Sequence, residues 1–251
     1  MPLFRKKAVW AIGFANAFAF LCQFVGQKYT SASVAALLVN LSVVMAAAGG
    51  AVFLGERISG VKGAGVALAV VGTLLVTTNG SLQGLEAGQL LGDVLYLVAA
   101  VAWGGYIVYA KKETDEQSWD PFSLAVCVVA VTAVFVSPVA LITGGGVPMG
   151  VVPVFAIAYT AVFNTAIPYI LYQQGLKHLT ASTSAIVLTL EIVVALAISA
   201  VFLGESLSGF AWAGALLILG SIVMVSRAEG SGGPLRVRPR SDEPKARGPT
   251  A

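Results

Sequence analysis

Long apolar runs alternate with short polar or glycine-rich turns over most of the 251 residues of the chain. A helix needs about 20 apolar residues to cross the hydrocarbon core of a bilayer, where its backbone groups must bond to one another. The runs that approach or exceed this length are residues 8–26, 33–54, 61–78, 90–110, 121–143, 151–173, 182–203 and 209–226. The pattern therefore predicts an all-α integral membrane protein of about eight transmembrane helices.

The composition supports this interpretation. Hydrophobic residues make up 57% of the chain and charged residues only 11%, whereas a soluble domain has about 25% charged residues. A soluble fold has too little polar surface to cover so many apolar side chains, so lipid is the expected solvent. Residues 227–251 differ, because they are rich in proline, glycine, serine and charge. We expect a disordered tail there.

The basic residues are unevenly divided between the two sides of the membrane that these runs define. Lys28 is alone on one side. The opposite side has all the other basic residues, namely Arg5, Lys6, Lys7, Arg57, Lys62, Lys111, Lys112, Lys177, Arg227, Arg236, Arg238, Arg240, Lys245 and Arg247. By the positive-inside rule, both termini are expected in the cytoplasm and the chain in a cell (inner) membrane. Basic residues are not interleaved with aromatic residues, so nucleic acid is not an expected partner.

The sequence contains an internal repeat. When the chain is shifted by 149 residues, 19 of 40 positions are identical between residues 26–65 and 175–214. The two copies have opposite orientations, because the turn that holds Glu56 carries basic residues and the turn that holds Glu205 carries none. Inverted repeats are typical of secondary transporters, whose halves move around a site near the membrane midplane.

The repeat also divides the chain unevenly. The last three apolar runs match the first three, and the fourth and fifth have no counterpart. We therefore expect an incomplete first repeat of three helices in residues 1–80, a second repeat of five helices in residues 81–226, and the tail in 227–251. The favoured explanation is a recorded start downstream of the true one, with two helices before Met1; loss of these helices is the alternative.

The repeated motifs resemble those of the drug/metabolite transporter superfamily, in particular its ten-helix EamA-type members. Both copies have a Leu-Gly-Glu turn, at 54–56 and 203–205, followed by a glycine-bearing helix. The similarity covers roughly residues 7–226. It implies two five-helix halves and transport of amino acids, other metabolites or drugs without ATP. The sequence departs from the family at Ile192 and Val43, which replace the proline that would kink the seventh and second helices.

Glu191 is the one carboxylate deep within an apolar run. Charged residues at this depth are costly and normally mark a pathway, so Glu191 is a candidate for proton coupling or for holding a substrate ammonium. The alternative is a neutral group that joins neighbouring helices. Ser184 lies seven residues earlier and is expected on the same helical face. Asp93, Glu56 and Glu205 are expected to cap or tie helix ends.

Further candidates lie on other helices. Tyr96, Trp103 and Tyr106 fall on one face of the fourth helix, where they could hold an apolar or cationic substrate; ordinary helix packing is the alternative. Four polar residues in apolar runs need partners in other helices or in a substrate, namely Asn16, Gln23, Asn40 and Asn164. Pro168 is expected to kink the sixth helix.

These observations favour a secondary transporter of a small metabolite, such as an amino acid, that exports its substrate by alternating access. A truncated or degenerate membrane protein with a structural or regulatory role is the alternative. An enzyme is not expected, because the sequence has no cluster of titratable or metal-binding groups at one depth. The expected partners are a small-molecule substrate and the lipid bilayer, with a homodimer as one possible assembly. No cofactor or metal is expected.

Overall fold

The computed structural model describes residues 2–81, 90–117, 119–143, 150–202, 204 and 206–230. Within them, eight helical spans are long and apolar enough to cross a membrane, as the sequence predicts. The helical elements are η1 (Pro2–Arg5), α1 (Lys7–Gly26), α2 (Ala32–Asn40), α3 (Ser42–Phe53), α4 (Gly60–Thr78), α5 (Leu90–Gln117), α6 (Pro121–Ile142), α7 (Val151–Tyr159), η3 (Thr160–Ala166), α8 (Ile167–Leu176), α9 (Ala181–Leu188), α10 (Leu190–Phe202) and α11 (Gly209–Gly230). The sequence predicts that Glu205 ties a helix end and that residues 231–251 belong to a disordered tail. Both lie outside the described residues.

Polar side chains fix where several helices begin. Capping residues accept a hydrogen bond from a backbone N–H of the first turn at Ser31, Ser59, Asp120 and Thr180. Each of them satisfies an N–H group that has no partner inside its helix. At Asp120 the backbone N–H of Ser123 donates at 2.8 Å, and this bond lowers the pKa of the exposed carboxyl. Short polar connections therefore set the ends of the apolar runs.

Two repeat-related spans are interrupted near their middle. The second span breaks at Leu41 between α2 and α3, and the seventh breaks at Thr189 between α9 and α10. Both the N–H and the hydroxyl of Thr189 donate to the carbonyl of Ile186, at 3.1 and 2.6 Å, which tightens the turn locally. The absence of a proline at Ile192 and Val43 therefore does not leave these helices continuous.

Pro168 distorts the sixth span, as expected from the sequence. The seven residues Thr160–Ala166 form a π-helix, which ends directly before α8 and its Pro168. Proline has no N–H to donate, and its ring crowds the carbonyl four residues earlier, so the preceding turn widens. The span thus consists of α7, the wide turn η3 and α8.

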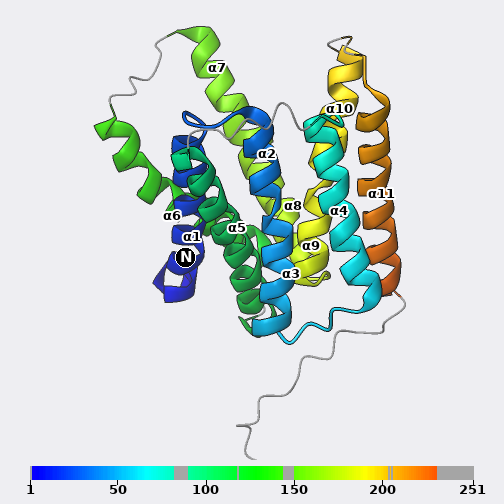
Figure 1. Cartoon of the computed structure of the whole chain (residues 1–251). Helices are drawn as coiled ribbons and strands as arrows, with labels where there is room; N and C mark the ends of the chain where they lie inside the picture. Colours follow the sequence, from blue (N-terminus) through cyan, green and yellow to red (C-terminus); the bar gives the residue numbers. More distant parts are fainter. Residues whose placement is uncertain are drawn as a thin grey trace, which may run out of the picture.

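The two copies of the repeat run in opposite directions (Figure 1). The turn between α3 and α4 lies at the lower side, the side on which the N-terminus also lies, whereas the turn between α10 and α11 lies at the top. Both turns use a glycine with left-handed backbone, with φ of 66° at Gly55 and 68° at Gly204, a conformation that side chains disfavour. The predicted inverted repeat of three and five helices is confirmed.

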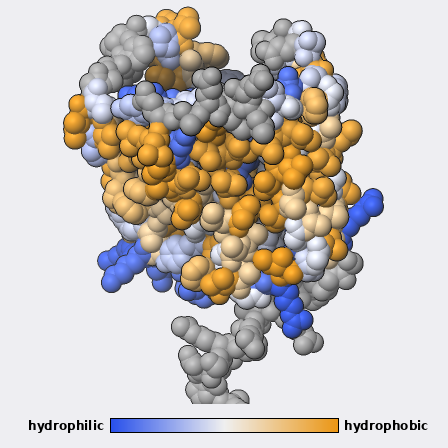
Figure 2. Space-filling view, in the orientation of Figure 1, coloured by the Kyte–Doolittle hydropathy of each residue, from blue (hydrophilic) through white to orange (hydrophobic). Residues whose placement is uncertain are grey.

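The bundle has an apolar belt and one basic end. Hydrophobic residues cover the middle of the face in Figure 2, and hydrophilic residues gather along its lower edge. We call this the basic end; it holds the α3–α4 turn, the last part of α5 and the end of α8, with Arg57, Lys62, Lys111 and Lys177.

The most buried apolar residues lie in the bundle interior, with members such as Ile12 of α1, Tyr106 of α5, Val128 of α6 and Ile186 of α9. Among the described residues, α7, η3 and α10 contain no buried residue. The second repeat is therefore packed tightly towards the basic end and loosely towards the opposite end.

Candidate functional site

A buried group of polar and aromatic side chains lies where α1, α5 and α8 meet. We call it the central cluster; its members are Asn16, Tyr106, Tyr169, Tyr172 and Gln173. The Tyr169 hydroxyl donates to Asn16 Oδ1 at 2.7 Å, and Gln173 Nε2 donates to the Tyr106 hydroxyl at 3.4 Å. The rings of Tyr106 and Tyr172 stack at 6.0 Å. Since α1 and α8 come from different repeats, the cluster joins the two halves of the molecule.

Asn16 also anchors α6. Its Nδ2 donates to Thr132 Oγ1 at 2.9 Å, and the Thr132 hydroxyl donates to the carbonyl of Val128 at 2.8 Å. With an exposed fraction of 1%, Asn16 is fully buried. Its amide thus uses both ends to connect three helices, which satisfies a polar group that lipid could not.

Some polar atoms near the protein interior have no partner. In the part of the chain that the structure describes, these buried atoms include the Tyr172 hydroxyl, Gln173 Oε1 and the Ser184 hydroxyl. Buried polar atoms without a hydrogen bond are costly, and each one needs an explanation such as a water molecule or a ligand. The central cluster therefore offers an unused acceptor on Gln173 beside aromatic rings.

Trp103 and Tyr106 lie together, as their spacing predicts. Their rings meet edge to face at 5.6 Å, and the indole N–H of Trp103 points to Gln23 Oε1 at 3.4 Å. Tyr96 is also buried, but it packs against Gly26, where a Cβ would stand only 2.9 Å from its ring. Of these three aromatic residues, Tyr106 therefore belongs to the central cluster, Trp103 lies beside it, and Tyr96 packs elsewhere.

Ser184 and Glu191 do not share one face. Ser184 is 5% exposed in α9, whereas Glu191 is exposed in the first turn of α10. The break at Thr189 separates the two helices, so the seven-residue spacing of a continuous helix does not apply. The carboxylate of Glu191 has no hydrogen bond or ion pair to any described residue.

The remaining asparagines lie outside the cluster. Asn40 is the last residue of α2, and its Nδ2 donates to the carbonyl of Ala36 at 2.8 Å. Asn164 is exposed within the π-helix η3, four residues before Pro168.

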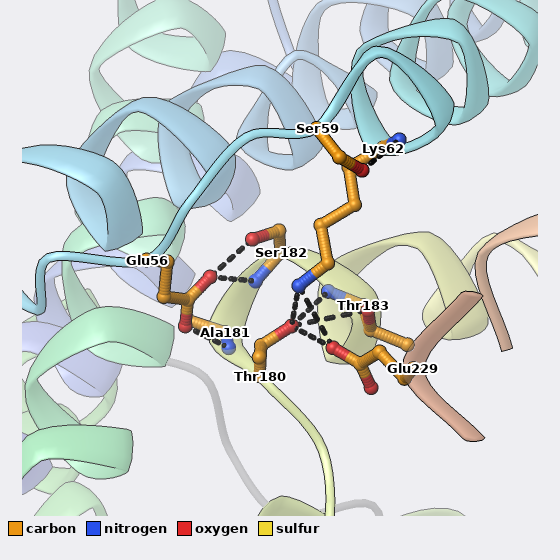
Figure 3. Close-up of polar contacts among 8 residues, drawn as sticks. All are labelled: Glu56, Ser59, Lys62, Thr180, Ala181, Ser182, Thr183 and Glu229. Carbon is orange, nitrogen blue, oxygen red and sulfur yellow. Dashed lines mark hydrogen bonds and ion pairs between the residues drawn. The ribbon is translucent and has the colours of Figure 1, made fainter. Parts of the chain in front are cut away.

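A second polar group joins the repeats at the basic end (Figure 3). We call it the basic-end network; its side chains are Glu56, Lys62, Thr180, Ser182 and Glu229. Glu56 lies in the α3–α4 turn and accepts hydrogen bonds from the backbone N–H of Ala181 at 2.6 Å and of Ser182 at 3.3 Å, and from the Ser182 hydroxyl. A first-repeat carboxylate therefore caps the N-terminus of α9 in the second repeat, which confirms that Glu56 ties helix ends.

Lys62 forms the other half of this network. Its Nζ donates to Glu229 Oε1 at 2.9 Å and to Thr180 Oγ1 at 3.0 Å. The Thr180 hydroxyl in turn donates to Glu229. The side chains of Lys62 and Glu229 are only 11% and 15% exposed, so this ion pair is better shielded from water than a surface pair. It links α4, α9 and α11.

The sequence matches the EamA-like transporter family over residues 4–78 and 90–227. The chain belongs to this family. It is therefore a multi-pass membrane protein of a family of membrane transporters.

Individual relatives agree with this membership. The EamA-like chain is 29% identical over 229 residues to an uncharacterized transporter of Bacillus subtilis (strain 168), covering 88% of the chain and 74% of the relative. It is 30% identical to an uncharacterized transporter of Archaeoglobus fulgidus, over 65% of the chain and 56% of the relative. A probable amino-acid metabolite efflux pump of Salmonella typhimurium is 29% identical, over 76% of the chain and 66% of the pump. The chain thus spans less than two thirds of the last two relatives.

The fold has a close counterpart among solved structures. A protein of known crystal structure superposes with a TM-score of 0.78, covering 92% of the EamA-like chain and 80% of its own. The two sequences are 18% identical, so this likeness concerns the fold alone.

Sequence reasoning missed three functional candidates in this EamA-like chain. Gln173 and Tyr172 lie at the end of an apolar run, where residues often face water or headgroups. Lys111 directly follows an apolar run in the sequence, where a solvated side chain is expected. In the structure it is 2% exposed and donates to the carbonyl of Leu176 at 3.0 Å and to Asp115 at 2.7 Å. A lysine that caps the last turn of another helix has no local sequence signal, because its partner is 65 residues away.

Proposed function

We propose that this protein is a secondary transporter that exports a small amine-bearing metabolite, such as an amino acid, by alternating access and without ATP. The observation that carries the proposal is the position of the central cluster. It is buried, polar, and built from helices of two inverted repeats. When such repeats move against each other, a site between them is exposed to each side in turn.

The chemistry of the central cluster favours an ammonium group. Gln173 Oε1 is a buried acceptor without a donor among the described residues, and the rings of Trp103 and Tyr106 lie beside it. Aromatic faces attract cations, the more so where water is excluded. The described part of the cluster carries no charged side chain, which suits a substrate whose own charges cancel, such as an amino acid.

Glu191 is the proposed coupling group. It lies near the middle of the seventh span and is exposed in the loosely packed half of the second repeat. A carboxyl at this depth is costly when charged and facing lipid, so it needs a proton, a cation or water. Entry of a proton at Glu191, coupled to release of the substrate from the central cluster on the opposite side, would drive export.

The basic end is proposed to face the cytoplasm of a cell membrane. Arg57, Lys62, Lys111 and Lys177 lie at this end, together with the N-terminus and the described end of α11. Basic residues near span ends are retained on the cytoplasmic side. The loosely packed end would then face outward.

The test is reconstitution of the full chain in liposomes with an imposed proton gradient. Vesicles are loaded with radiolabelled amino acids one at a time, and efflux or counterflow is followed. Gradient-driven movement of at least one amino acid, abolished by a protonophore, is the expected result. Absence of movement for every amino acid tested, with protein correctly inserted, would contradict the proposed substrate class.

A structural or regulatory role without transport is the alternative. Under this alternative the protein would be folded and inserted but would show no counterflow with any metabolite pool, including a whole-cell extract.

A further inference from the structure

The basic end of the molecule is closed by polar bonds between the repeats. Glu56 joins the α3–α4 turn to α9, and Lys62 joins α4 to α9 and α11. Lys111 adds a bond within the second repeat, from α5 to the end of α8. The opposite end differs, because α7, η3 and α10 contain no buried residue among those described. The structure is therefore closed at one end of the bundle and loosely packed at the other.

We infer that the basic-end network is the gate of this end, which must open for a substrate to pass between the central cluster and the compartment on that side. This inference rests on the proposed transport function. Glu56 and Lys62 are the latch residues, since each one bonds across the boundary between repeats. Opening requires the N-terminus of α9 to part from the α3–α4 turn and the ion pair between Lys62 and Glu229 to break.

The bonds of the network suit a contact that forms and breaks. Within the network itself, Glu56, Lys62 and Glu229 are held by hydrogen bonds to charged groups, which water can replace when the surfaces part. A core of interlocked apolar side chains would open only at a larger cost. Glu56 is half-buried and Glu229 lies at the end of α11, so water reaches both as soon as the contact loosens.

Gly50 supports the inference, because it leaves the space that the Glu56 carboxylate occupies in the network. An added Cβ at Gly50 would stand 2.7 Å from Glu56 Oε2 and 2.9 Å from its carboxyl carbon. The backbone N–H of Glu56 also donates to the Gly50 carbonyl at 3.0 Å. The missing side chain of Gly50 thus makes room for the Glu56 carboxylate in the network.

The first experiment measures opening without any knowledge of the substrate. A reporter thiol is introduced by Ser184→Cys, one turn beyond the α9 N-terminus, in a chain whose native thiols are removed by Cys22→Ala and Cys127→Ala. Ser184 is 5% exposed, so the thiol should react slowly with an impermeant maleimide. Vesicles of both orientations are compared, so that each end of the bundle is probed separately.

Glu56→Gln and Lys62→Met should each raise labelling from the basic end about tenfold, equivalent to about 1.4 kcal/mol in the gate equilibrium. Labelling from the opposite end should not rise. The matched control is Glu116→Gln, which removes an exposed carboxylate at the same end. Should Glu56→Gln fail to fold, Ser182→Ala and Gly50→Ala perturb the same contact and should give the same direction of change. Labelling of all these variants at the control rate overturns the inference.

The second experiment holds the contact closed. Glu56→Cys and Ser182→Cys are combined in the thiol-free chain and joined with a short bifunctional thiol reagent. Linked protein should lose transport, and a cleavable linker should restore it after reduction. Normal transport by the linked protein would overturn the gate. If the labelling results hold but no amino acid is ever transported, the proposed substrate class fails and the gate stands.

Discussion

Gly65 of α4 lies directly against Val225 of α11, so closely that a Cβ at Gly65 would stand 2.2 Å from Val225 Cγ2. The repeat partners of these two residues, Gly214 and Val76, make the same contact at the other end of the helix pair, at 2.7 Å. Each pair maps onto the other when the two helices are exchanged. The pseudo-two-fold axis of the inverted repeat therefore passes between α4 and α11, where the Gly72 carbonyl would also contact a Cβ at Gly214.

This contact predicts a stability effect. Gly65→Ala should lower the free energy of unfolding by about 1–3 kcal/mol, because the new methyl group overpacks a close helix crossing. Thermal unfolding in detergent measures the change. Gly220→Ala is the matched control, since nothing lies within 4 Å of a Cβ at that position of α11. Adding Val225→Ala should recover part of the loss, and the absence of any recovery would argue against the proposed contact.

The position of the central cluster predicts that Gln173 matters for transport and that the adjacent Gln174 does not. Gln173 is 1% exposed and its Oε1 is unpartnered among the described residues, whereas Gln174 is exposed on the other side of α8. Gln173→Leu should reduce substrate counterflow at least tenfold, a loss of about 1.4 kcal/mol or more in substrate interaction. Gln174→Leu should leave it near the wild-type rate. Equal rates for the two variants would remove Gln173 from the substrate pathway.

A substitution of Glu191 should affect proton coupling without affecting folding. Glu191→Gln keeps the shape and hydrogen bonding of the side chain but removes the titrating proton. Gradient-driven transport should be abolished, while the protein remains inserted and unfolds at the wild-type temperature. Transport that is still driven by the proton gradient in this variant would reduce Glu191 to a structural role. In that case the coupling group would have to be sought elsewhere along the pathway.

The hydrogen bond from Tyr169 to Asn16, which joins the two repeats, should contribute to stability. Tyr169→Phe removes the hydroxyl that donates to Asn16 at 2.7 Å, and it should cost about 0.6–2 kcal/mol, the range for hydrogen bonds between membrane helices. Tyr159→Phe in α7 is the control, because Tyr159 is 51% exposed. Chemical denaturation in detergent would compare the two. An equal effect of both substitutions would show that the Asn16 bond contributes nothing measurable.

The orientation can be tested with fusions. A reporter that is active only in the cytoplasm should be active after Arg227, and one that is active only outside should be active within the glycine loop at 144–146. Both expectations follow from the charge distribution, with the basic end inside. Cytoplasmic activity from the glycine loop would contradict the eight-span topology.

The sequence alone was sufficient for the spans, the inverted repeat and the role of Glu56 at a helix end. These features depend on the length of apolar runs, on identity between distant segments and on local turn chemistry, all of which are visible along the chain. Pro168 belongs with them, because the loss of its N–H distorts a helix wherever it lies.

The tertiary structure alone decided which polar groups meet. The separation of Ser184 from Glu191, the burial of Lys111 and the pairing of Gln173 with Tyr106 depend on how helices are rotated and broken. A helix in lipid carries apolar residues on all its faces, so hydrophobic periodicity does not reveal which face points into the bundle. Close approach of small residues and bonds between distant polar groups set that rotation, and neither is a property of a single helix.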